Sequence, residues 1–330
     1  AMAALPRAVS LLAVVPLLFA CERPATSPSA VVAADFVHAT SGLVLNETGY
    51  KTRVVADGLT SPQGTVEFGN GLIFVTASGT REIVRVLPSG AHKTFAAFPA
   101  PGSLVDLIFD PGRGLFASTI LAPIGLAAPV WRVGMNGDTT RFAAVAGAQT
   151  FLALDDAGRL YVTQAVGDVV RVELDGSITA VVDANPATTR LRGITFDEQG
   201  RLYVHSAGES PSKTRIRRFD LAAATLFPIP LADGDLITDV LPVPPTPSPL
   251  QDLLFWPQGG GDLFTVDASN VYRVKLDGTV SVFASGLTSG PAPVFNTLAL
   301  SGAGDLLVTE YAGGRVTRIS RCGPPRPRAK

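Results

Sequence analysis

Short apolar runs recur along the chain, separated by tight-turn sequences. Residues 151–154 form one run, residues 155–158 read Asp-Asp-Ala-Gly, and residues 160–163 read Leu-Tyr-Val-Thr. Aromatic and β-branched residues favour strands, whereas Asp and Gly favour turns. A third run at 169–172 is followed by Asp-Gly at 175–176, a dipeptide typical of two-residue hairpins. The pattern therefore predicts consecutive strands of one antiparallel sheet.

The same unit occurs six times. Its second strand begins at a large apolar residue in every copy: Ile73, Leu115, Leu160, Leu202, Leu263 and Leu306. These starts are 42 to 45 residues apart, except for one spacing of 61. A period of about 40–45 residues with four strands per unit is the mark of a β-propeller. We therefore predict an all-β fold, a six-bladed β-propeller of four-stranded antiparallel blades.

Two near-identical segments predict how the ring closes. Residues 52–56 and residues 280–284 each precede Gly-Leu-Thr-Ser, and both fit the outermost strand of a blade. The last blade ends near Ile319 with only three strands. We expect residues 52–56 to complete it, because an N-terminal strand on the last blade removes an open sheet edge.

The long spacing marks an insertion between blades four and five. It contains Leu-Pro-Val-Pro-Pro-Thr-Pro-Ser-Pro at residues 241–249, which favours extended polyproline geometry and cannot pair as a central strand. We interpret it as a long connection across one propeller face. It is either a passive spacer or a partial lid over the central channel.

The first 21 residues have the pattern of an export signal. Arg7 precedes a nearly apolar stretch, residues 8–20, that is short for a membrane span. Residues 18–21, Leu-Phe-Ala-Cys, resemble a bacterial lipobox and predict lipidation of Cys21. The protein would then be a membrane-anchored lipoprotein facing the periplasm or the cell exterior. The alternative is an ordinary secretory signal cut near residues 33–34.

The expected domains follow from these patterns. Residues 1–21 are the signal, residues 22–41 a Pro/Ser/Ala-rich disordered tether, residues 42–321 the propeller and residues 322–330 a tail. If Cys21 carries lipid, Cys322 is left unpaired. Otherwise a Cys21–Cys322 disulfide can form in an oxidising compartment.

Net charge and composition limit the classes of binding partner. The 330 residues have a net charge of -1 and only 17% charged residues. Lys and Arg residues are not clustered in the sequence, so no nucleic-acid-binding surface is predicted. The chain is expected to be a monomer that meets a membrane only through its lipid, with a small molecule at the central channel or a protein as partner.

Polar side chains are predicted to ring one channel mouth. The starts of the inner strands supply Gln63, Asp106, Gln149, Arg192, Gln251, Asp252 and Asn296, and the ends of the second strands supply Thr76, Thr119, Gln164, His205, Asp267 and Glu310. This ring either solvates the mouth or forms a small-molecule site. Arg192 is suited to a carboxylate or phosphate. His205 is the candidate proton carrier, unless it is structural.

Three further Asp residues, Asp110, Asp155 and Asp197, recur at the same place in successive blades. Recurrence at a turn predicts turn-forming side chains rather than a metal cluster.

Residues 52–320 resemble the NHL and senescence-marker-protein/gluconolactonase group of six-bladed propellers. The closest local match is the last blade, where residues 296–300 read Asn-Thr-Leu-Ala-Leu and residues 306–310 read Leu-Leu-Val-Thr-Glu. The resemblance implies a lactone or ester hydrolase in which a divalent cation polarises the carbonyl and activates water. Asp267 falls where that group places a metal-ligand Asp.

The chain departs from that group at other ligand positions. Gln63-Gly64 stands in place of a Glu, and Gln149-Thr150 and Arg192-Gly193 stand in place of Asn residues. A guanidinium repels a cation instead of binding it.

The site that remains predicted has two parts. Asp252, Asp267, Asn296 and Glu310 are the candidate ligands for Ca²⁺, Mg²⁺, Mn²⁺ or Zn²⁺, since hard cations prefer oxygen donors. His205, Arg192 and Asp267 are the candidate catalytic residues. We expect a small-molecule-binding propeller with this hydrolase site at the channel mouth, or alternatively a non-catalytic scaffold lipoprotein that binds proteins.

Overall fold

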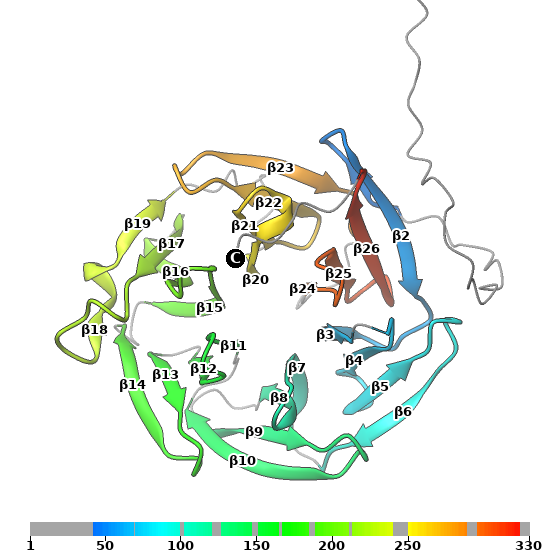
Figure 1. Cartoon of the computed structure of the whole chain (residues 1–330), viewed down its shortest axis with the longest axis horizontal. Coiled ribbons are helices and arrows are strands. Elements are labelled where there is room, and N and C mark those ends of the chain that lie inside the picture. Colours follow the sequence, from blue (N-terminus) through cyan, green and yellow to red (C-terminus); the bar gives the residue numbers. More distant parts are fainter. Residues whose placement is uncertain are drawn as a thin grey trace, which may run out of the picture.

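The chain folds as a ring of six antiparallel sheets. The computed structural model describes residues 42–68, 70–99, 102–120, 127–146, 151–164, 167–184, 189–210, 213–239, 250–288 and 296–323. In the described residues, each sheet contains four strands of one blade, and the blades follow one another around a central axis (Figure 1). The prediction of a six-bladed propeller is therefore confirmed.

Blades one to three follow the repeat directly. Blade one contains β3 (Pro62–Glu67), β4 (Ile73–Ala77), β5 (Glu82–Val86) and β6 (His92–Ala97). Blade two contains β7 (Ser103–Asp110), β8 (Gly114–Ile120), β9 (Ala127–Val133) and β10 (Thr139–Ala146). Blade three contains β11 (Leu152–Leu154), β12 (Leu160–Thr163), β13 (Val169–Val172) and β14 (Ile178–Asp183).

Blades four to six complete the ring. Blade four contains β15 (Arg190–Phe196), β16 (Leu202–Ser210), β17 (Lys213–Phe219) and β19 (Asp235–Thr238). Blade five contains β20 (Asp252–Trp256), β21 (Asp262–Val266), β22 (Asn270–Val274) and β23 (Val280–Ser285). Blade six contains β24 (Thr297–Leu300), β25 (Leu306–Glu310), β26 (Arg315–Arg321) and β2 (Tyr50–Ala56).

The ring closes through two N-terminal strands. β2 pairs antiparallel with β26, with Thr52 opposite Ile319 and Ala56 opposite Val316, as the sequence predicts. A second strand was not predicted: β1 (Val44–Leu45) adds to the outer edge of blade five by pairing with β23. The N-terminal part of the propeller therefore fastens two consecutive blades.

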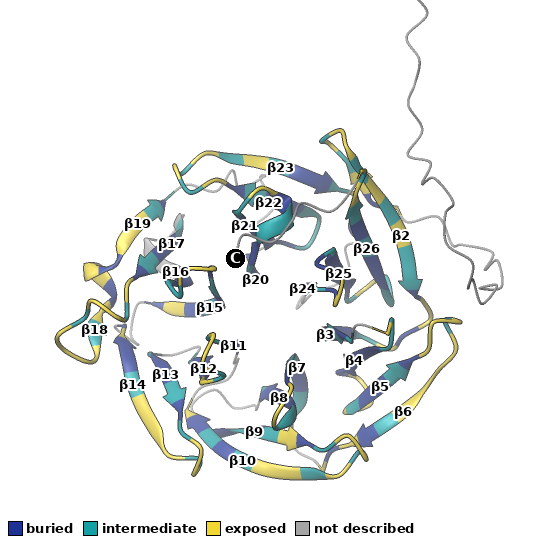
Figure 2. Ribbon diagram, in the orientation of Figure 1, coloured by how far each residue is buried: buried dark blue, intermediate teal, exposed yellow. Residues whose placement is uncertain are grey.

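The hydrophobic core is divided among the blade interfaces. The buried apolar residues of the described chain form six clusters, and each lies mainly between two neighbouring blades. Figure 2 shows the same distribution, with buried second and third strands and partly exposed outer strands. Since no blade can bury both faces alone, each is stabilised by its neighbours.

The insertion that lengthens the fourth repeat has a structural role that the sequence did not predict. Part of it lies between β17 and β19, inside blade four, and forms β18 (Ile229–Pro230). β18 runs parallel to β14 and extends the outer edge of blade three. The Pro-rich residues 241–249, predicted as a spacer or lid, lie outside the described residues.

Alternation of antiparallel strands defines two faces. We call the side where the inner strands β3, β7, β11, β15, β20 and β24 begin the start face. The opposite side, where each inner strand turns into the second strand, is the hairpin face. Side chains at the beginning of an inner strand and at the end of a second strand therefore lie at the start face.

Candidate functional site

The start face carries equivalent β-bulges in blades one, two and four. In blade one, Gln63 and Gly64 lie opposite Thr76, because the register shifts between Pro62 and Thr65. In blade two, Val105 and Asp106 lie opposite Ser118, because the register shifts between Leu104 and Leu107. In blade four, Arg192 and Gly193 lie opposite His205, because the register shifts between Leu191 and Ile194. Bulges re-aim side chains and are common beside functional sites.

The glycines in the bulges of blades one and four permit close packing of inner strands. A Cβ on Gly193 would lie 2.2 Å from the Leu253 nitrogen in blade five. A Cβ on Gly64 would lie 2.3 Å from the Leu107 nitrogen in blade two. Only glycine fits where two backbones approach this closely, which explains the Gln-Gly and Arg-Gly pairs of the sequence.

The bulges of blades one and four bring together polar atoms that have no hydrogen-bond partner within the described part of the chain. Both ring nitrogens of His205, the Nε of Arg192, the Oε1 of Gln63 and the Oγ1 of Thr76 are inaccessible to solvent and unpaired. His205 is fully buried, with 0% of its surface exposed, whereas Arg192 is only partly buried. Buried polar atoms normally find a partner. All the unpaired buried His, Gln and Thr atoms of the described residues lie in these two bulges, which makes the bulges candidate binding sites.

Burial controls the protonation of the blade-four pair. The pKa of His205 is lowered to about 3, first by burial and second by the positive charge of Arg192. Burial, together with the charge of Arg190, also lowers the pKa of Arg192. His205 is therefore neutral near pH 7, which disagrees with its predicted role as a proton carrier there. It remains able to donate one hydrogen bond and accept another.

Two Asp residues join neighbouring blades at the start face. Asp106 accepts hydrogen bonds from the backbone nitrogens of Leu107 and, in blade three, of Leu152, both at 2.8 Å. Asp252 accepts from the Leu253 nitrogen at 2.7 Å and, in blade six, from the Leu298 nitrogen at 2.8 Å. The two side chains thus perform the same structural task in blades two and five.

The same two carboxyl groups also interact electrostatically. Burial raises the pKa of Asp106 to about 6. Burial, and second the charge of Asp106, raise the pKa of Asp252 well above its usual value. A desolvated carboxyl resists ionisation, and a second one nearby adds to that resistance.

The predicted metal ligands do not form a metal site. Asp267 begins a turn: its Oδ1 accepts from the backbone of Ser269 and Asn270, and its Oδ2 accepts from the Tyr272 hydroxyl at 2.8 Å. The Asn296 amide donates to the Asp267 carbonyl at 2.9 Å, and its Oδ1 accepts from the Tyr311 nitrogen.

Glu310 is also held by the protein. It accepts from the Thr288 backbone and hydroxyl and from the Thr317 hydroxyl, and it pairs with Arg315 at 3.4 Å. Among the described residues, no three His, Cys, Asp or Glu side chains gather as metal ligands do. With Asp252 also engaged by backbone nitrogens, the four predicted ligands are all held by protein donors or acceptors and do not gather as a cation site, and Asp267 acts as a turn residue.

The recurrent turn Asp residues behave as predicted. Asp110, Asp155 and Asp197 each accept hydrogen bonds from backbone nitrogens two and three or four positions later. Each also pairs with the Arg that closes its turn. These side chains fix the first hairpin of blades two, three and four.

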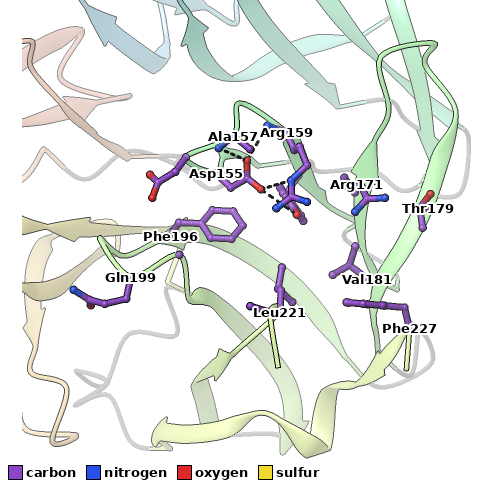
Figure 3. A pocket seen from close by; sticks show the side chains of 14 residues that line it. Asp155, Ala157, Arg159, Arg171, Thr179, Val181, Phe196, Gln199, Leu221 and Phe227 are labelled. Atoms are coloured by element: carbon purple, nitrogen blue, oxygen red, sulfur yellow. Dashed lines mark hydrogen bonds and ion pairs between the residues drawn. The ribbon is translucent and has the colours of Figure 1, made fainter. Parts of the chain in front are cut away.

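A pocket on the hairpin face was missed by the sequence reasoning. It has a volume of 540 Å³ and lies between blades three and four (Figure 3). Phe196, Leu221 and Phe227 contribute apolar walls, and Arg159 and Arg171 lie on the blade-three side. Leu221 and Phe227 belong to the insertion after β17, so the one irregular repeat spacing was the only available signal.

The predicted lipid attachment site lies outside the described residues, as does Gln149. Cys322, just after β26, is disulfide-bonded. That state corresponds to the alternative in which the chain's two cysteines pair. A sulfur atom cannot carry both a lipid thioether and a disulfide, so the two predictions exclude each other. Within the described ranges, no helix is long and apolar enough to cross a membrane.

Comparisons with known proteins agree with the fold. No protein-family model and no curated protein sequence matches the chain. Among solved structures, a putative oxidoreductase (glucose dehydrogenase) from Thermus thermophilus is similar over 82% of this chain and 100% of its own, with 16% identity and a TM-score of 0.60. A gluconolactonase from Xanthomonas campestris covers 86% of this chain and 96% of its own, with 13% identity and a TM-score of 0.59.

A third similar structure is virginiamycin B lyase from Staphylococcus aureus. It covers 82% of this chain and 98% of its own, with 14% identity and a TM-score of 0.52. At these identities the similarity shows the fold alone. The chain is a six-bladed β-propeller whose structural neighbours include gluconolactonase-like proteins and sugar dehydrogenases.

Proposed function

We propose that this chain is a small-molecule-binding propeller of gluconolactonase-like architecture, with its ligand at the blade-four bulge on the start face. One observation carries the proposal. His205 is fully buried with both ring nitrogens unpaired, directly opposite Arg192, whose Nε is also unpaired.

The physical argument concerns the cost of unpaired polar atoms. A buried donor or acceptor without a partner destabilises a protein by about 1–3 kcal/mol. The carboxyl groups on the same face avoid this cost by accepting backbone hydrogen bonds. A ligand with hydroxyl or carboxyl groups that binds at the partly exposed Arg192 and displaces the atoms covering His205 would supply the missing partners to both residues.

The names of the structural neighbours suggest the class of ligand. They include a gluconolactonase, a glucose dehydrogenase and an aldose sugar dehydrogenase, and these names refer to sugars and to the lactone of a sugar acid. A metal-assisted lactone hydrolysis is the less favoured function, because the predicted ligands are engaged by the protein. Neutral His205 would orient a ligand rather than exchange protons with it.

Binding to glucose, gluconate and gluconolactone tests the proposal. Saturation-transfer NMR on the wild type is compared with His205→Leu, which removes both ring nitrogens at similar volume. Phe227→Ala is the matched control, since it changes the pocket on the hairpin face. We expect at least one of the three compounds to bind the wild type and Phe227→Ala but not His205→Leu.

Two results would contradict this site. Loss of binding in Phe227→Ala with retention in His205→Leu would place the ligand in the hairpin-face pocket. Absence of binding by all three compounds would favour the alternative function, a scaffold that binds proteins. Circular dichroism and thermal unfolding of both variants establish that they are folded.

Export completes the proposal. Arg7 and the apolar residues 8–20 support an export signal, and the disulfide-bonded Cys322 supports an oxidising compartment such as the periplasm or the cell exterior. Such a location would give the propeller access to ligands from outside the cell.

A further inference from the structure

We infer that the ligand at the blade-four bulge carries an oxyanion, a carboxylate or a phosphate, which binds Arg192. This inference rests on the proposed function and specifies the chemical class of its ligand. It also assigns distinct tasks to Arg192 and His205.

The first step is the missing counter-charge of Arg192. A guanidinium stays protonated in proteins, so it requires compensation wherever it is withdrawn from water. In the described part of the chain, no carboxylate lies within ion-pair distance of Arg192. The charged neighbour that affects the pKa of Arg192 is Arg190, which is also a cation, and His205 opposite it is neutral.

Other partly buried arginines of this chain show a different arrangement. Their guanidinium groups lie within 2.7 Å of a carboxylate oxygen in the pairs Arg113–Asp110, Arg201–Asp197 and Arg273–Asp262. Arg318 is likewise paired with Glu67. Arg192 thus differs from these four arginines, and it shares its unpaired buried Nε with Arg85 of blade one.

The acids of the start face cannot fill this gap. Asp106 and Asp252 are turned toward backbone nitrogens of the neighbouring blades. Their raised pKa values further reduce the negative charge they offer. Arg190 and Arg192 therefore create a local positive potential, which favours an anion.

His205 adds a second requirement to the ligand. Its neutral ring has one N–H donor and one nitrogen acceptor, and both are unpaired. The donor suits an oxygen of the anion, and the acceptor suits a hydroxyl group. A hydroxy acid or a phosphorylated polyol satisfies Arg192 and His205 together, with a planar carboxylate able to bind the guanidinium through two parallel hydrogen bonds.

Calorimetric titration of the full chain tests the charge requirement. The probes are gluconate, inorganic phosphate, glucose 6-phosphate and neutral glucose. Arg192→Met removes the cation, Arg192→Lys keeps the charge without the planar fork, and Arg132→Met removes an exposed arginine of blade two as a control. Thermal unfolding of each variant with and without phosphate gives a second readout and shows that each variant folds.

We expect gluconate or a phosphate compound to bind the wild type and Arg132→Met with equal affinity. Arg192→Met should weaken that binding at least tenfold and abolish the anion-dependent rise in Tm. Arg192→Lys should weaken gluconate more than phosphate if the natural group is a carboxylate. Equal losses would indicate binding through charge alone, as a phosphate allows.

The failures of the two proposals are distinguishable. If glucose binds the wild type and His205→Leu loses it, while no anion depends on Arg192, the oxyanion inference is wrong and the proposed function stands. If Arg132→Met weakens anions as much as Arg192→Met, binding is non-specific and the inference is again wrong. If no probe binds at all, both proposals fail.

Discussion

Replacement of Gly193 by alanine should destabilise the propeller at the candidate site. The added Cβ would lie 2.2 Å from the Leu253 nitrogen, 2.5 Å from the Asp252 carbonyl carbon and 2.6 Å from the Leu253 Cβ. Two of these are backbone atoms of blade five, which cannot rotate away as a flexible side chain can. The φ of Gly193 lies outside the left-handed region, so the effect arises from packing alone.

The magnitude follows from two opposing effects. Overpacking of a close-packed interior costs about 1–3 kcal/mol, sometimes more. The reduced freedom of the unfolded chain offsets about 0.4–1 kcal/mol of that cost. Because the overlap is with backbone, we expect a net loss of about 2 kcal/mol in the free energy of unfolding. The same shift should displace Arg192 and weaken ligand binding.

Urea denaturation followed by tryptophan fluorescence measures this loss. Trp256 is fully buried in β20, the strand that the added Cβ would contact, and is a suitable reporter. Gly112→Ala is the control, since its nearest new neighbour would be an Asp110 oxygen at 3.4 Å. Unfolding midpoints that coincide for the wild type, Gly193→Ala and Gly112→Ala would refute the close-packing explanation of the bulge glycine.

Three further predictions concern protonation and the cysteines. Burial raises the pKa of Asp106 from 3.8 to about 6 in the folded protein. The folded state is therefore favoured when Asp106 is protonated, and this contribution to stability is lost as the pH rises from about 4 to about 6. Asp106→Asn should flatten that part of a plot of Tm against pH. The lowered pKa of His205 has the opposite effect on stability. Its contribution is fully present above pH 6.5 and falls by about 1.4 kcal/mol per pH unit between pH 6.5 and about 3. His205→Leu should remove this loss. Cys322→Ser should remove the disulfide and change mobility on a non-reducing gel, and Cys21→Ser should have the same effect without changing the fraction in which the protein is found; release from the membrane fraction by Cys21→Ser would contradict the disulfide and indicate a lipid at Cys21.

The repeat made most of the fold predictable. Each blade repeats a large apolar residue after a turn glycine, so six independent copies support one architecture. The pairing of residues 52–56 with the last blade followed from a missing fourth strand and is confirmed. β1 and β18 escaped prediction because they have two residues each and pair with blades far away in sequence.

The site was less predictable because side-chain partners are a tertiary property. From sequence, Asp267 has the position of a metal ligand, yet it is a turn former held by Tyr272. The sequence grouped Arg192 and His205 with Asp267 as candidate catalytic residues at the channel mouth. Only the bulge register places Arg192 and His205 opposite each other, and only burial shows that they lack partners.

The two N-terminal strands have a consequence for biosynthesis. β1 and β2 leave the ribosome before any blade, but their partners β23 and β26 end at residues 285 and 321. During most of translation they are unpaired edge strands, open to incorrect pairing and aggregation. Blades one to four can assemble earlier, but the ring itself can close only in a late step that depends on synthesis of its final strand.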